Sequence, residues 1–151
     1  MAGRGRWVRH SRKRPVTADG LPASVSDPGT WCSYREAKAS GFGDGFGFVL
    51  GDGVGGLDLD GVVDADGSLA EAARTLLDAL PATYTEVSPS GRGLHVFGLM
   101  PERPGRVVGF AGIKVEIYSK GRFFTVTGRR WGGAPSSLAD LGAQAALLTA
   151  M

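Results

Sequence analysis

The stretch that decides the fold is Gly55-Gly56-Leu57-Asp58-Leu59-Asp60-Gly61. Side chains alternate between the two faces of a strand, so Leu57 and Leu59 share one face while Asp58 and Asp60 share the other. Two neighbouring carboxylates repel each other, so both stay ionised only in water or around a cation. A hard divalent ion such as Mg²⁺ suits such an oxygen pair. A solvated strand edge without any ion is the alternative interpretation.

The composition predicts one globular domain over residues 1–151, because 42% of the residues are hydrophobic and the length suits a single core. The single cysteine, Cys32, excludes an internal disulfide and a cysteine-rich zinc site. No run approaches the roughly 20 apolar residues of a membrane span, and no apolar signal region follows Met1. We therefore expect a protein without membrane contact, located in the cytoplasm, or in the host cytoplasm if it is phage-encoded.

Positive charge is concentrated in two parts of the chain. Residues 1–14 contain six Arg/Lys and no acid, which leaves 11 basic against 15 acidic residues elsewhere. Residues 103–130 contain seven Arg/Lys and one acid, Glu116. A basic N-terminal arm over residues 1–14 suits phosphate backbones, although a solubilising terminus would look the same. The predicted nucleic-acid contacts are Arg9, Arg12, Lys13, Arg14, Lys120, Arg129 and Arg130.

The remaining patterns predict a mixture of strands and helices. Strands at 46–50 and 56–60 are expected to form a hairpin, since Gly51-Asp52-Gly53 has turn chemistry. A second hairpin is expected between strands at 113–118 and 123–128. Helices are expected at 31–39 behind an N-cap at Thr30, after a capping box of Ser68 with Glu71, and after Ser136 or Ser137. This order of elements indicates an α+β protein.

A loop with phosphate-binding chemistry is formed by Ser88-Pro89-Ser90-Gly91-Arg92-Gly93-Leu94-His95. Hydroxyl donors, backbone N–H groups beside glycines and the fixed charge of Arg92 are the groups that bind a polyphosphate. His95 begins an alternating strand, where it can donate to a phosphate oxygen or take part in acid–base catalysis. An ordinary turn and a core histidine are the alternatives. The run from Ile113 to Tyr118 alternates as well, which makes Glu116 a candidate third carboxylate.

In chain order, three motifs resemble those of a known domain: Leu57-Asp58-Leu59-Asp60, Ser88-Pro89-Ser90-Gly91-Arg92-Gly93-Leu94-His95, and Val115-Glu116-Ile117-Tyr118 followed by Arg122-Phe123-Phe124-Thr125-Val126-Thr127-Gly128. The domain is the bifunctional primase-polymerase (Prim-Pol) domain of the archaeo-eukaryotic primase superfamily, found in phage and plasmid replication proteins. The resemblance covers roughly residues 6 to 128. It implies an α+β catalytic core in which a small α/β unit joins an RRM-like antiparallel or mixed sheet with flanking helices.

The resemblance also implies the roles of the motif residues. Asp58, Asp60 and Glu116 would bind two Mg²⁺ or Mn²⁺ ions and, with His95, would form the catalytic set. The loop and one later basic residue would bind the incoming nucleotide through Ser88, Ser90, Gly91, Arg92, Gly93, His95 and Arg122. The expected reaction is template-dependent nucleotidyl transfer by a DNA primase/polymerase in phage or plasmid replication.

The expected partners are a DNA template with its primer, dNTPs or NTPs or both, and a separate replicative helicase. A helicase is expected as a separate protein because members are commonly fused to one and this chain has no room for it. Two other functions remain open at this point: a nucleic-acid-binding accessory module without catalysis, and a metal-dependent nuclease.

Overall fold

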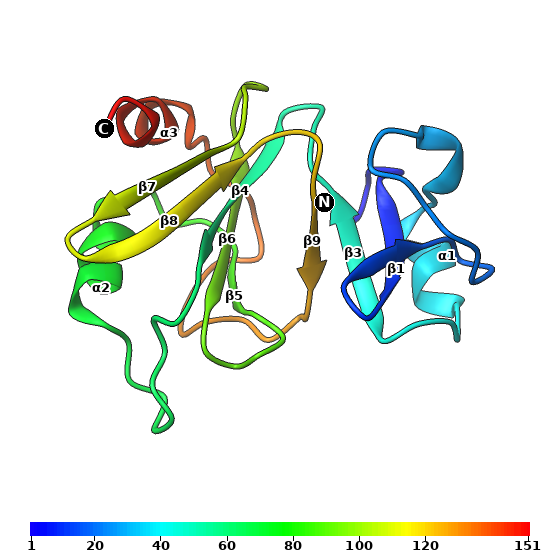
Figure 1. The fold of residues 1–151 in the computed structure, drawn as a ribbon, viewed down its shortest axis with the longest axis horizontal. Helices are drawn as coiled ribbons and strands as arrows, with labels where there is room; N and C mark the ends of the chain where they lie inside the picture. The colour runs from blue at the N-terminus through cyan, green and yellow to red at the C-terminus, as the bar shows by residue number, and fades with distance from the viewer. The chain divides into compact units, whose positions relative to one another are not determined.

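The computed structural model describes residues 1–151 and divides them into two compact units. The first unit consists of residues 1–50 and 121–127, and the second of residues 51–120 and 128–151. Each unit contains one sheet in which every strand pair is antiparallel, together with short helices (Figure 1). The α+β class is therefore confirmed. No helix has both the length and the apolar character needed to cross a membrane.

The first unit is a four-stranded sheet with the strand order β2-β1-β3-β9. Its elements are β1 (Trp7–Ser11), β2 (Arg14–Val16), the 3₁₀ helix η1 (Pro28–Thr30), α1 (Tyr34–Ala39), β3 (Gly45–Val49) and β9 (Phe123–Val126). Trp7 is buried, and its ring lies 4.8 Å from that of Tyr34 and 5.3 Å from that of Phe48. Much of the basic N-terminal segment is thus folded, because β1 and β2 form a hairpin in this sheet.

The second unit is a five-stranded sheet with the order β5-β6-β4-β8-β7. Its elements are β4 (Val54–Leu59), α2 (Glu71–Asp78), β5 (Thr85–Val87), β6 (Leu94–Leu99), β7 (Arg106–Phe110), β8 (Ile113–Tyr118) and α3 (Gly142–Thr149). The two helices and one face of the sheet share a core that contains Leu57, Leu59, Leu76, Leu94, Val96, Ile117, Leu141 and Leu148. Since the alternating apolar residues fill this face, the polar residues between them must occupy the other.

Both predicted hairpins are wrong, although the strands themselves are present. β3 pairs with β1 and β9, whereas β4 pairs with β6 and β8 in the other sheet. The chain also leaves the second sheet after β8 and enters the first at β9. The turn at Gly51-Asp52-Gly53 does form, with φ values of 141°, 51° and 87°. Turn chemistry predicts a change of direction, but the partner of each strand is decided by packing across the whole sheet.

The predicted helix starts are also wrong. Ser33 rather than Thr30 caps α1, in a capping box with Glu36. Ser68 and Glu71 have the same spacing but form no such box, because the Ser68 N–H donates to Asp66 and its carbonyl accepts from Asp64. Neither Ser136 nor Ser137 caps α3, which begins directly after Leu141. Each helix nevertheless packs an apolar face against the core, with Ala73 and Leu76 of α2 and Ala145 and Leu148 of α3 buried.

Candidate active site

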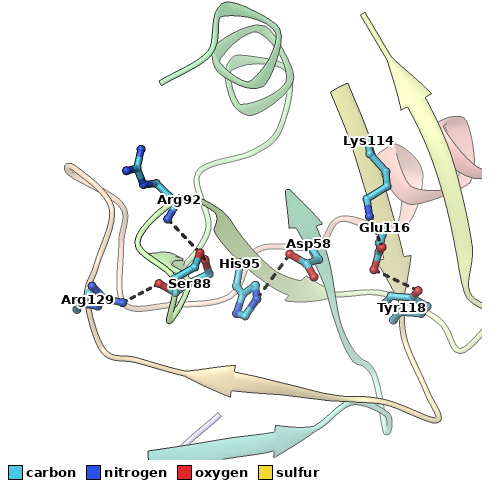
Figure 2. A network of polar contacts seen from close by, with 9 residues as sticks. Asp58, Ser88, Arg92, His95, Lys114, Glu116, Tyr118 and Arg129 are labelled. Atoms are coloured by element: carbon cyan, nitrogen blue, oxygen red, sulfur yellow. Dashed lines mark hydrogen bonds and ion pairs between the residues drawn. The ribbon is translucent and has the colours of Figure 1, made fainter. Parts of the chain in front are cut away.

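Four polar residues form a row across the face of the second sheet that lies opposite its apolar core. The register pairs Asp58 on β4 with His95 on β6 and with Glu116 on β8, and pairs His95 with Glu86 on β5. Residues directly opposite each other on neighbouring antiparallel strands project from the same face. The row therefore runs Glu86, His95, Asp58, Glu116, and Figure 2 shows its last three members. Glu116 thus lies on the same side of the sheet as Asp58.

Asp58 is the least satisfied member of this row. Its Oδ1 atom is buried without a hydrogen bond and lies 3.6 Å from Nε2 of His95, which is close enough for electrostatic attraction but too long for a hydrogen bond. Burial raises the pKa of Asp58, the charges of Asp60 and Glu116 raise it further, and His95 opposes them. An orphaned carboxylate oxygen with other acids nearby is a position that a cation would stabilise.

The other two acids border Asp58 in different ways. Asp60 is exposed and follows the last residue of β4. Glu116 is half-buried: its Oε1 lies 3.0 Å from Nζ of Lys114, and its Oε2 accepts a hydrogen bond from the Tyr118 hydroxyl at 3.3 Å (Figure 2). The Glu116 carboxylate raises the pKa of Lys114. No three His, Cys, Asp or Glu side chains converge closely enough to hold a metal ion in this arrangement.

The loop of residues 88–93 lies against the end of β4. Gly93 is buried there, and a Cβ at this position would lie 2.7 Å from the carbonyl oxygen of Leu59 and 3.5 Å from Cα of Asp60. Only glycine permits this close approach without displacing the backbone. Gly93 therefore brings the predicted nucleotide-binding loop next to the predicted metal ligands.

Much of the polar inventory of this loop is used within the loop. The N–H of Gly91 donates to the carbonyl of Ser88, and the N–H of Arg92 donates to the hydroxyl of Ser90. Ser88 is buried with its hydroxyl 3.2 Å from that of Ser90. The sequence predicted free N–H groups here, and these two are not free. What the loop presents to solvent is the exposed Arg92 and the edge formed by Ser90.

Arg129 belongs to this loop as well. Its guanidinium donates to the carbonyl oxygen of Ser88 at 2.6 Å (Figure 2), and the N–H of Val87 donates to the carbonyl of Arg129. The sequence placed Arg129 among the nucleic-acid contacts, and in the structure its guanidinium contacts the start of the loop predicted to bind the nucleotide. Lys120 and Arg130 are exposed in the same unit.

The remaining predicted basic contacts lie in the first unit. Arg9 is held in place, because its guanidinium donates to the carbonyl of Phe42 at 2.8 Å and lies over the ring of Phe46. Arg12, Lys13 and Arg14 are exposed at the β1–β2 turn. Arg122, expected to bind phosphates, directly precedes β9 and belongs to this unit rather than to the unit of Asp58.

Sequence reasoning missed Glu86. Its side chain is 0% exposed, accepts a hydrogen bond from the Tyr84 hydroxyl at 2.8 Å, and accepts another from the N–H of Gly128 at 3.4 Å. The signal was present, because a tight loop from Ser88 to Gly93 pairs Val87 with Leu94 and hence Glu86 with His95. Counting outward from the loop would have placed this acid beside the histidine.

The second unit combines an antiparallel sheet with a Ser/Gly loop beside a histidine and a row of acids, and comparison with known proteins identifies the family. Residues 6–141 match the family described as bifunctional DNA primase/polymerase, N-terminal. The chain belongs to this family. It is 40% identical over 141 residues to the DNA primase-polymerase of Nitratiruptor phage NrS-1. That match covers 84% of this chain and 20% of the phage protein, so the chain spans about one fifth of its relative.

Proposed function

We propose that this chain is a single catalytic domain that carries out template-dependent nucleotidyl transfer as a DNA primase/polymerase in phage or plasmid replication. The observation that supports this most directly is the position of Asp58 between His95 and Glu116, on the sheet face opposite the core. The family membership and the phage relative support the same reaction class. We propose that this reaction takes place in the cytoplasm.

Two divalent ions, Mg²⁺ or Mn²⁺, would be held by Asp58, Asp60 and Glu116. The orphaned Oδ1 of Asp58 supports this assignment, because a buried carboxylate oxygen without a donor is stabilised by a cation. Bound ions of this kind polarise phosphate oxygens and make a primer hydroxyl more acidic. The protein supplies carboxylates on one sheet face, where strand pairing fixes their spacing.

The triphosphate of the incoming nucleotide would bind at the loop of residues 88–93. Arg92 supplies an exposed positive charge, Ser90 a hydroxyl, and His95 a ring N–H beside Asp58. Arg122 is proposed as a further phosphate contact. In nucleotidyl transfer, positioning and charge neutralisation account for most of the rate enhancement. The internal hydrogen bonds of the loop support this role, because they fix its shape before a nucleotide binds.

The polymer substrate would be a primed DNA template, with dNTPs, NTPs or both as the monomers, and a separate replicative helicase would supply single strands. Contacts to the DNA backbone would come from exposed cations, among them Lys120, Arg130 and those of the β1–β2 turn. Such contacts release counterions, so template binding should weaken steeply with added salt.

Primer extension on a labelled template tests this proposal. The wild-type chain should extend the primer with Mg²⁺ or Mn²⁺ and stop in EDTA, and Asp58→Ala should abolish extension while the circular dichroism spectrum stays unchanged. Equal extension by Asp58→Ala would overturn the proposed function. Shortening of the labelled strand in the absence of nucleotides would instead identify a nuclease, and tight DNA binding in EDTA without incorporation would identify an accessory module.

A further inference from the structure

The Glu116 carboxylate already has a cation. Lys114 lies two residues before Glu116 on β8, so both side chains project from the same face of the strand. Nζ of Lys114 lies 3.0 Å from Oε1 of Glu116, and Figure 2 shows the ammonium pointing directly at the carboxylate. The Lys114 side chain is 52% exposed, whereas that of Glu116 is 21% exposed. The pair therefore lies at the border between the site and solvent.

Both oxygens of Glu116 are occupied, which sets it apart from Asp58. The Tyr118 hydroxyl donates a hydrogen bond to Oε2 of Glu116, and the Lys114 ammonium forms an ion pair with Oε1. In Asp58, by contrast, Oδ1 is buried without a hydrogen bond. The charge of Glu116 is thus already partly neutralised by the Lys114 ammonium. A metal ion at Glu116 would compete with that ammonium for the same carboxylate.

We propose that Lys114 is the resident counter-cation of the ion-free site and that its ammonium competes with a divalent ion for Glu116. This inference rests on the proposed function, in which Glu116 is a metal ligand. Lys114 suits the role because an ammonium is a compact point charge on a flexible stem, which can swing into solvent when it is replaced. An exposed pair of this kind is weak, so the exchange is readily reversible.

The proposal makes an unusual prediction, namely that removing a side chain beside the site improves ion binding. Lys114→Gln should bind Mn²⁺ about two- to fivefold more tightly than the wild type, the range expected for an exposed ion pair. Lys114→Glu should bind more tightly still, because it adds a carboxylate. Lys114→Arg keeps the charge and should stay close to the wild type.

The measurement is a titration of the full chain with Mn²⁺ alone, in which electron paramagnetic resonance reports the free ion. Arg74→Gln is the matched control, because it removes one exposed positive charge on α2, against the opposite face of the same sheet. It should leave the Mn²⁺ affinity unchanged. Circular dichroism checks that each variant is folded.

Two results separate the inference from the proposed function. Asp58→Asn should weaken Mn²⁺ binding, and equal binding by Asp58→Asn and the wild type would overturn the proposed metal site together with this inference. A site that depends on Asp58 but has the same affinity in Lys114→Gln as in the wild type would overturn the inference alone. Arg74→Gln tightening the affinity as much as Lys114→Gln would also overturn it, since the effect would then be one of net charge.

Discussion

Glu86 and Asp58 are acids on the same sheet face, one on each side of His95, but their surroundings differ. Glu86 is 0% exposed and accepts hydrogen bonds from the Tyr84 hydroxyl and the Gly128 N–H. The Asp58 side chain is 24% exposed, yet its buried Oδ1 has no donor. The more buried acid is therefore the better satisfied one. Unmet hydrogen-bonding capacity, rather than burial, distinguishes the acid that is available to a ligand.

The largest expected effect comes from Asp58→Asn. An amide keeps the shape of the side chain but removes the charge that would hold an ion. Primer extension should therefore fall by more than about 100-fold, because mutating even a residue that only hydrogen-bonds to a metal ligand costs up to about that much. The melting temperature in EDTA should not fall, because no hydrogen bond to Oδ1 is lost. Extension rates and thermal melts on one preparation test both statements. A variant that loses activity only because it unfolds would contradict the distinction between the two acids.

Glu86→Ala should lower the stability of the protein while leaving most of its activity intact, the reverse of what is expected for Asp58→Asn. It leaves the Tyr84 hydroxyl and the Gly128 N–H without their acceptor, which should cost about 1–3 kcal/mol of unfolding free energy. Urea denaturation measures that loss. At a temperature where the variant is folded, its extension rate should stay far above that of Asp58→Asn. If Glu86→Ala were fully stable but inactive, Glu86 would be a functional acid and the comparison would fail.

The first unit contains the same contrast among its basic residues. The guanidinium of Arg9 is bound to the Phe42 carbonyl, whereas the side chains of Arg12 and Lys13 form no hydrogen bond or ion pair. These two residues are the centre of the β1–β2 turn, with φ values of 50° and 65°. Positive φ is strained for residues other than glycine, and asparagine followed by glycine suits such turns best. The turn is therefore less stable than its geometry allows.

Replacing Arg12 and Lys13 together by Asn and Gly should separate binding from stability. The melting temperature should rise, because the strain is relieved. Binding to single-stranded DNA should weaken, and the slope of log affinity against log salt should fall by about 1.4, or about 0.7 for each lost phosphate contact. Arg35→Gln with Lys38→Gln is the matched control, since it removes two exposed charges from α1 of the same unit. Equal salt slopes in the turn variant and the wild type would exclude the turn from the DNA contacts.

The sequence predicted which residues share a strand face but not the connections between strands. Alternation is local, so Leu57 and Asp58 could be assigned to opposite faces without knowing which strands lie beside β4. Strand pairing is not local, and a glycine turn after Leu50 looks the same whether the chain returns to its own sheet or enters another. Helix capping shows the same limit. Ser33 and Ser68 are each followed three residues later by a glutamate, but the backbone N–H and carbonyl of Ser68 are hydrogen-bonded within a turn to Asp66 and Asp64.

Which polar groups are already in use was likewise invisible in the sequence. In the sequence, nothing distinguishes Arg9, Arg129 and Lys114 from the other basic residues. Their partners, the carbonyls of Phe42 and Ser88 and the carboxylate of Glu116, depend on the folded backbone. Only Lys114 has a partner two residues away on the same strand, so it is the one of the three that alternation could have identified.

The smallest expected effect is a pH dependence of the difference in stability between wild type and Asp58→Asn. Burial raises its folded-state pKa above the ordinary value of 3.8, so the folded protein holds this proton more tightly than the unfolded chain does. The favourable contribution is complete below the unfolded-state pKa and is lost as the pH rises through the folded-state value. In EDTA, wild type should therefore lose melting temperature relative to Asp58→Asn as the pH rises above the ordinary carboxyl value of about 4. Because a bound cation favours the ionised carboxylate, Mn²⁺ should reverse the sign of this difference near neutral pH. If the difference in melting temperature between the two proteins in EDTA did not change with pH, burial would not raise the pKa of Asp58, and the contrast with Glu86 would fail.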